Sequence, residues 1–319
     1  RAEAEMYRAH AVNDLAVLPP APGYRVWVDE PGQFTTQHVT ALHHTFHQHP
    51  LMQLPQLAQL AGRLMASGQC RFMAPGATQA SALASVLHEA SPDGRGIDEV
   101  FSHIERPGTW VALYNVETDP AYRAFLDEVM ASVRSLLTGR QPGIFKVSGY
   151  VFISAPPSVT PFHIDRENNF WLQLCGRKTI NVWDATDREV VAAKDVEDFV
   201  IFGSLDGVRL KDSVRSRSHE FQCGPGDGVY FPSTSPHMTQ VLPGDGVCVS
   251  MGVVFYTQVT RRHARVHQVN HVLRRLGLSP RSPGESLRLD RLKAPFGYLL
   301  ALARKGRRGR GFVPPPGSY

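Results

Sequence analysis

The 319-residue sequence lacks an uninterrupted apolar stretch of the roughly 18–20 residues that cross a bilayer, so we expect no transmembrane segment and no membrane partner. Its first residues, Arg1 to Glu5, contain two acidic side chains and no apolar core of the kind found in a signal peptide. Cysteine is scarce. The chain has four cysteines, and no two of them form a C-x-x-C pair: they are Cys70, Cys175, Cys223 and Cys248. This usage gives no support for a zinc knuckle and favours reduced thiols in a cytoplasmic protein.

Several functional motifs are also missing. The sequence contains no P-loop, no G-x-G-x-x-G fingerprint and no G-x-S-x-G elbow, which leaves nucleotide binding and serine hydrolysis without support. Hydrophobic residues make up 42% and charged residues 20% of the chain. That composition excludes collagen-like, coiled-coil and wholly disordered proteins and is sufficient for a sizeable core.

Positive charge is concentrated at the C-terminal end. Residues 261–319 contain 14 basic and two acidic residues, whereas the formal charge of the whole chain is only +5. The highest density of positive charge is in the run KGRRGR from Lys305 to Arg310. No aromatic interleaving and no nucleic-acid motif accompany this charge. We therefore expect a solvated tail or a basic face against the acidic body, and do not expect a nucleic-acid partner.

The hydrophobic pattern changes twice along the chain. Helical apolar spacing predicts helices at residues 51–65, 77–88, 120–137, 266–276 and 299–303. Short β-branched and aromatic runs predict strands at residues 24–28, 144–154, 169–174, 178–183, 199–202, 219–222, 228–231 and 247–256. Three regions follow: a mostly helical region at 1–142, a β-rich core at 143–258, and a helical, basic segment with a Pro/Gly-rich end at 259–319. Closely spaced short strands favour a sandwich or small barrel clasped by helical flanks.

The chemistry is concentrated in the segment TPFHID at residues 160–165. In an extended segment, His163 and Asp165 point to the same face, since alternate side chains do so. The third ligand that a metal needs is expected to be His237, with the strand residue His219 as a less favoured competitor. Two histidines and one carboxylate form the facial triad of non-haem iron oxygenases, which leaves three metal positions open.

A second signal lies one strand further on. A dicarboxylate that chelates iron at one end needs a cation and a hydroxyl at the other, and Lys178 and Thr160 suit those roles. The competing interpretation of Lys178 alone is a solvated residue beside a turn. The presence of the triad favours the binding role.

A histidine-rich run offers another metal hypothesis. His43 and His47 are four residues apart and would share a helix face, with His44 and His49 beside them. No cysteine or carboxylate completes a zinc set nearby, and Pro50 breaks a helix there. We therefore expect these histidines to form a polar segment that leads into the helix at residues 51–65, and not a metal site.

Two motifs together resemble a known family. The pattern TPFHID-x3-NFW-x-Q-x2-G-x-K over residues 160–178, followed by GD-x4-P-x4-H over residues 226–237, looks like the Jumonji-C/cupin-like Fe(II)- and 2-oxoglutarate-dependent oxygenases, and resembles their asparaginyl-hydroxylase-like branch. The resemblance implies a mainly β fold with a double-stranded β-helix core of the jelly-roll, cupin-like kind.

The resemblance also implies a ligand set. Iron would lie on His163, Asp165 and His237, and 2-oxoglutarate on Lys178 and Thr160, with O2 as the third reactant. Asn169 matches a position that lines the family's pocket. Related hydroxylases often place an asparagine near the end of the last barrel strand, where this chain has Ser250 as a substitute.

We therefore expect an oxygenase that hydroxylates an unactivated C–H bond, either in an amino-acid side chain of a peptide or protein or in a small metabolite. Demethylation is the less favoured outcome. The alternative is a cupin-like metal-binding or regulatory module without oxygenase activity. The amphipathic run from Val266 to Leu276 could pack on the barrel or form a dimer interface, and family resemblance favours a homodimer.

Overall fold

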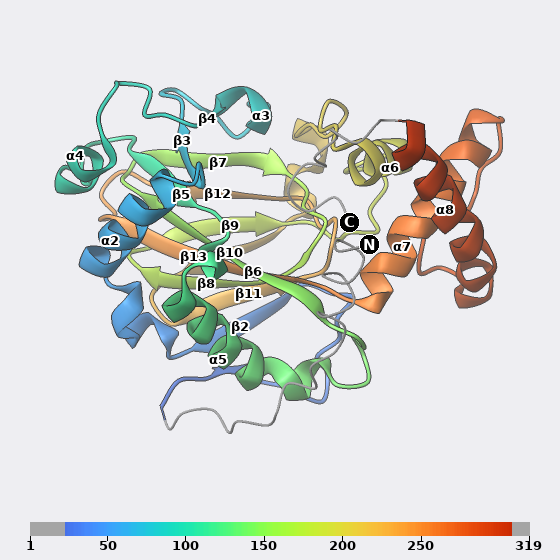
Figure 1. Ribbon diagram of the computed structural model, residues 1–319, viewed down its shortest axis with the longest axis horizontal. Coiled ribbons are helices and arrows are strands. Elements are labelled where there is room, and N and C mark those ends of the chain that lie inside the picture. The colour runs from blue at the N-terminus through green and yellow to red at the C-terminus, as the bar shows by residue number, and fades with distance from the viewer. Residues whose placement is uncertain (1–22, 308–319) are drawn as a thin grey trace.

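A computed structural model describes residues 23–307, and the side chains of residues 23–304. The basic run from Lys305 to Arg310 therefore lies outside the described side chains. Thirteen strands form two antiparallel sheets of nine and four strands. Figure 1 shows the strands at the centre, with α2 and α4 at one end and α7 and α8 together at the other. None of the helices between residues 23 and 307 combines the length and the hydrophobicity that a membrane crossing requires.

The larger sheet carries the main core. Its strands, in spatial order, are β1 (Val26–Trp27), β2 (Thr40–His44), β11 (Asp227–Phe231), β8 (Asn168–Cys175), β13 (Cys248–Tyr256), β6 (Phe145–Ser154), β5 (Trp110–Leu113), β3 (Cys70–Met73) and β4 (Leu87–His88). The central strand β13 is buried along its full length, including its polar residue Ser250.

The smaller sheet closes the barrel and carries much of the site. Its order is β10 (His219–Cys223), β9 (Lys178–Val182), β12 (His237–Val241) and β7 (Ser158–His163). From β6 onward the chain passes back and forth between the two sheets. This is the jelly-roll, double-stranded β-helix core predicted from the sequence, and helical flanks accompany it. Trp171, Ile180 and Phe231 pack between the two sheets.

The helices cover the outside of this core. They are α2 (Leu54–Met65), α3 (Leu83–Val86), α4 (Ile97–Ser102), α5 (Pro120–Leu137), α6 (Ala193–Phe202), α7 (Gln258–Arg275) and α8 (Leu287–Arg307), with 3-10 turns at Phe46–Gln48, Pro50–Met52, Val116–Thr118 and Asp212–Arg217. Helix α5 follows its sequence closely. The Asp119 side chain accepts a hydrogen bond from the Ala121 amide, Pro120 occupies the first turn, and Phe125 and Val129 are buried.

Two elements differ from their predictions. Residues 199–202 were expected to form a strand and are the last turn of α6. Their apolar run is the end of an amphipathic helix, in which Val196 and Phe199 are buried, and Gly203 ends it with φ of 80°. Residues 77–88 were expected to be a helix, but only Leu83–Val86 is helical, because that weak pattern has no buried face to stabilise it.

The first 142 residues contribute more than helices. Strands β1 to β5 lie in this region and pair into the larger sheet, where β5 lies beside β6 and β2 lies beside β11. The larger sheet therefore contains strands from both sides of the predicted boundary at residue 142. In the C-terminal region, α7 and α8 are longer than the segments that the spacing at residues 266–276 and 299–303 predicted.

The turn between β8 and β9, which leads into Lys178, requires a glycine. Gly176 has φ of 67°, and a Cβ atom there would lie 2.5 Å from the Val247 carbonyl oxygen. Gly68 has nearly the same φ, 66°, but open space around it. We expect Gly68→Ala to lose about 1 kcal/mol of unfolding free energy, and Gly176→Ala a further ~1–3 kcal/mol. Urea unfolding measures both, and equal losses would contradict the close packing of this turn.

Candidate functional site

Two histidines and one aspartate converge at the mouth of the barrel. His163 ends β7 and His237 begins β12, and the strand register places these two residues opposite each other. Their ring centroids are 4.1 Å apart. Asp165 follows β7, and its Oδ2 lies 3.8 Å from His163 Nε2 and 3.5 Å from His237 Nε2. Antiparallel pairing thus brings together residues 74 positions apart in the sequence.

The backbone orients both imidazoles. His163 Nδ1 lies 2.7 Å from the Pro161 carbonyl oxygen, and His237 Nδ1 lies 3.0 Å from the Ser235 carbonyl oxygen. Each Nδ1–H donates to its carbonyl, which leaves each Nε2 lone pair facing Asp165. Burial, and next the neighbouring His163, lower the pKa of His237 to about 4. Its ring is therefore neutral at pH 7, the form that binds a metal ion.

These three residues fit a divalent metal. Their ligand atoms all lie within 4.8 Å of one another, and no other group of three or more His, Cys, Asp or Glu side chains in the described part of the chain does the same. Two nitrogens and one carboxylate oxygen suit iron better than a closed zinc site, which would have four protein ligands.

Lys178 lies deeper in the barrel and is 3% exposed. Its Nζ donates a hydrogen bond to Ser250 Oγ at 3.0 Å. Within residues 23–304 no carboxylate forms an ion pair with it, and burial lowers its pKa to about 8. A buried ammonium group without an acidic partner is costly. An anionic ligand beside Ser250 would offset that cost.

Polar groups continue from Lys178 toward the triad. Thr160 Oγ1 accepts a hydrogen bond from Trp110 Nε1 at 3.1 Å, so its own proton remains available to a ligand. Asn169 is 5% exposed, and its Oδ1 has no hydrogen-bond partner among the described residues. With Ser250, these residues line a cavity of about 30 Å³ that reaches the triad. Six of the seven predicted site residues therefore line this cavity, and Lys178 contacts it through its hydrogen bond to Ser250.

A cleft opens from the triad toward the surface. It has a volume of about 400 Å³ and shares Tyr150, His163 and Asp165 with the inner cavity. Tyr114 and Arg71 line its sides, and Leu205 lies at its rim beyond α6. A reacting group could therefore reach the metal position from outside.

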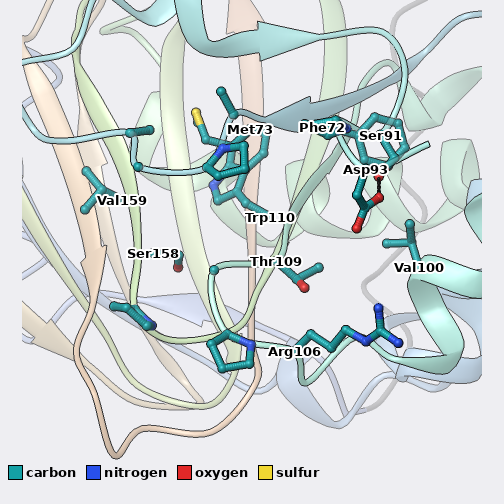
Figure 2. Close-up of a pocket in the computed structure, with 18 of the residues that line it drawn as sticks. Phe72, Met73, Ser91, Asp93, Val100, Arg106, Thr109, Trp110, Ser158 and Val159 are labelled. Atoms are coloured by element: carbon teal, nitrogen blue, oxygen red, sulfur yellow. Dashed lines mark hydrogen bonds between the residues drawn. The ribbon is translucent and has the colours of Figure 1, made fainter. Parts of the chain in front are cut away.

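Another cavity, of about 480 Å³, lies elsewhere. Figure 2 shows it beside Trp110, with Thr109 and Ser158 below and the Ser91–Asp93 hydrogen bond at one side. None of the triad residues lines it. The Trp110 ring, which also bonds to Thr160, lies between this cavity and the inner one.

The other histidines considered as metal ligands do not join a metal site in the part of the chain that the structure describes. His219 lies on β10 with its Nε2 3.4 Å from Asp184 Oδ1, which argues against it as third ligand. The helix that the metal hypothesis for His43 and His47 required does not form, because His43 belongs to strand β2. His44 instead makes hydrogen-bond contacts to the backbone carbonyls of Gln173 and Asp227.

Sequence reasoning missed several residues of the site. Trp110 lies 50 positions before Thr160, and no local pattern connects the two. Glu167 is also close, and burial, followed by the charge of Asp165, raises its pKa to about 7. The Tyr256 hydroxyl donates to Glu167 at 2.8 Å. Only the spacing from Asp165 to Glu167 could have indicated this second carboxyl group.

Comparisons with known proteins found one matching family and several similar solved structures. Residues 122–261 match the JmjC domain family. No curated protein matches the sequence. Among solved structures, the crystal structure of the Escherichia coli ribosomal oxygenase YcfD is 16% identical, with 86% of this chain and 67% of that chain covered and a TM-score of 0.48. A structure of the same E. coli protein with cobalt and 2-oxoglutarate is 17% identical, covers 87% and 67%, and has a TM-score of 0.45.

Proposed function

Because residues 122–261 match the JmjC domain family, we propose that this chain is an oxygenase that uses Fe(II), 2-oxoglutarate and O2. One observation carries the proposal. His163, Asp165 and His237 converge at the barrel mouth, and a buried lysine with no acidic partner among the described residues lies further along the same interior. A bound iron would activate O2 in a reaction that consumes the 2-oxo acid.

The protein's own residues supply position and surroundings. His163 and His237 would bind the metal through Nε2, and Asp165 through one carboxylate oxygen. Lys178 would form a charge-assisted hydrogen bond with the distal carboxylate of 2-oxoglutarate, while the Thr160 hydroxyl donates a second one. Ser250 holds the Lys178 ammonium group in place at 3.0 Å. Asn169 would donate its amide N–H to the bound cosubstrate.

The substrate would enter through the cleft of about 400 Å³. This volume accommodates an amino-acid side chain of a peptide or protein as well as a small metabolite. The reaction we propose is hydroxylation of an unactivated C–H bond of either substrate. If the oxidised carbon is an N-methyl group, the same step ends in demethylation.

Mass spectrometry tests this proposal. The protein is incubated with Fe(II), 2-oxoglutarate, air and separated protein and metabolite fractions of a cell extract. We expect succinate to form and one fraction to gain a single oxygen atom, with neither change in the Asp165→Ala variant. If the metal-loaded protein forms no succinate with any fraction, the alternative of a metal-binding or regulatory module replaces the oxygenase.

We also propose that the protein forms a homodimer through α8. Large apolar side chains on this helix are exposed at helical spacing: Leu289, Leu292, Phe296, Leu299 and Leu302. Such a contiguous apolar face is typical of an interface.

The four cysteines are free, which supports a reducing compartment such as the cytoplasm.

Light scattering tests the dimer. We expect twice the chain mass for the wild type and the single mass for Leu299→Glu, because a charge would be buried in the interface. Leu242→Glu is the control, since Leu242 is also exposed, at 46%, but lies after β12. A monomeric wild type, or the same response from both variants, would rule out this interface.

A further inference from the structure

A cavity of about 300 Å³ lies among α6, α7 and α8, on the far side of the segment that carries Asp165. Figure 1 shows these three helices gathered at one end of the barrel. The cavity is distinct from the cleft, but Arg166 lines both. The Asp165 carbonyl oxygen accepts a hydrogen bond from Thr234, which also lines the cavity, at 2.7 Å. The site therefore adjoins the metal-ligand segment without being part of it.

The lining of this cavity is strongly cationic. It contains three arginines, Arg166, Arg261 and Arg265, and two histidines, His263 and His267, and no aspartate or glutamate. Arg261 and Arg265 form no ion pair with any residue of the described chain. They lie four residues apart on α7, so their like charges share one helix face and repel each other.

The nearest acidic groups are already engaged elsewhere. Asp290 lies close enough to His263 to act on it electrostatically, but its Oδ2 accepts the Gly284 amide at 2.8 Å. Glu167 accepts the Tyr256 hydroxyl. Neither carboxylate lines the cavity. Arg261 and Arg265 therefore have no carboxylate beside them in the lining of the cavity.

Aromatic rings and backbone carbonyls hold the arginines in place. The Arg261 guanidinium lies 3.9 Å from the Phe145 ring centroid, and that of Arg265 lies 4.9 Å from the Tyr298 centroid. Arg166 is 8% exposed and donates hydrogen bonds to the carbonyls of Phe199 and Val200. Fixed guanidinium groups lose little conformational entropy when they bind an anion.

A buried imidazole also lines the cavity. His267 is 7% exposed and lines the cavity, and its Nδ1 has no hydrogen-bond partner in the described chain. An unsatisfied buried polar atom destabilises the fold unless a ligand or water satisfies it. The guanidinium groups of Arg261 and Arg265 are the donors in this cavity that suit an anion with several acceptor oxygens.

We propose that this cavity binds the phosphate group of a small molecule, either free phosphate or a phosphate monoester. A phosphate carries up to two negative charges and three acceptor oxygens, which match the neighbouring guanidinium groups of Arg261 and Arg265. The volume lies at the lower end of the range for small-molecule sites, so a compact phosphorylated metabolite also fits. The site does not depend on the oxygenase activity proposed above.

Titration calorimetry with the full-length chain tests the site, with inorganic phosphate as the first probe and chloride at matched ionic strength as the reference. We expect saturable phosphate binding by the wild type and a loss of affinity of about tenfold or more in Arg261→Gln and Arg265→Gln. Arg261 is exposed, so its replacement leaves the fold intact. Arg275→Gln, an exposed arginine at the end of α7 that does not line the cavity, should bind as the wild type does.

Glycerol phosphate and a nucleoside monophosphate are the second and third probes. Tighter binding of a monoester than of inorganic phosphate identifies a phosphorylated metabolite as the ligand, and tighter binding of inorganic phosphate identifies the free ion. The proposal is overturned if none of the three probes binds above the chloride reference. It is also overturned if Arg261→Gln and Arg265→Gln bind phosphate as tightly as Arg275→Gln does.

Discussion

Replacement of Asp165 by alanine is expected to abolish succinate formation and to weaken metal binding by more than about 100-fold. Asp165 is the only anionic ligand in the triad, with its Oδ2 3.5 Å from His237 Nε2 and 3.8 Å from His163 Nε2. Without it, two neutral imidazoles remain, and they neither balance the metal charge nor complete one face of its coordination sphere. Calorimetric titration with Mn(II) as a redox-stable probe measures the loss.

Asp98→Ala is the matched control, because Asp98 is an exposed aspartate in the first turn of α4, remote from the triad. It should bind Mn(II) and form succinate as the wild type does. Retention of turnover in Asp165→Ala would remove the carboxylate from the ligand set and with it the facial-triad interpretation.

Replacement of Lys178 by methionine is expected to weaken 2-oxoglutarate binding by about 10–100-fold, since one charge-assisted hydrogen bond to a carboxylate is lost. The same change should raise the thermal stability of the cosubstrate-free protein, because it removes a buried ammonium group that has no acidic partner among the described residues. Opposite effects on binding and stability are specific to a buried charge that is reserved for a ligand. Lys194→Met, at a solvated lysine on α6, should change neither quantity appreciably.

The pH dependence gives an independent check on Lys178. Burial lowers its pKa from 10.5 to about 8. Between pH 8 and 10.5 the unfolded chain therefore binds more protons at this residue than the folded protein does, so the contribution of Lys178 to stability rises with pH across that window. Cosubstrate affinity should instead fall above pH 8, as the ammonium loses its charge. Calorimetry at several pH values should show this fall in the wild type and not in Lys178→Met.

The short-range parts of the site could be predicted from the sequence. The alternation of an extended segment places His163 and Asp165 on one face, and β7 has that extended form. His237 was chosen over His219 on its Gly-Asp and Pro context. The structure places His237 opposite His163, whereas His219 faces Asp184. The register of the sheet explains why His237, and not His219, lies beside His163. The spacing of these residues in the sequence cannot show this.

The long-range parts could not be predicted. Trp110 reaches Thr160 only because β5 pairs with β6 at one side of the larger sheet, a non-local contact that leaves no periodic signal. The run at residues 199–202 was misassigned because four apolar residues fit a buried strand and the end of an amphipathic helix equally well. The cationic cavity depends on the packing of α7 against α8, which joins Arg265 to Tyr298 across a loop.

Anomalous diffraction from crystals grown with Mn(II) and 2-oxoglutarate tests the central claim most directly. We expect one manganese peak bonded to His163 Nε2, His237 Nε2 and one Asp165 carboxylate oxygen. The cosubstrate should occupy two further positions on the metal and extend its distal carboxylate to Lys178. A peak elsewhere in the chain, or a fourth protein side chain in the coordination sphere, would contradict the proposed oxygenase site.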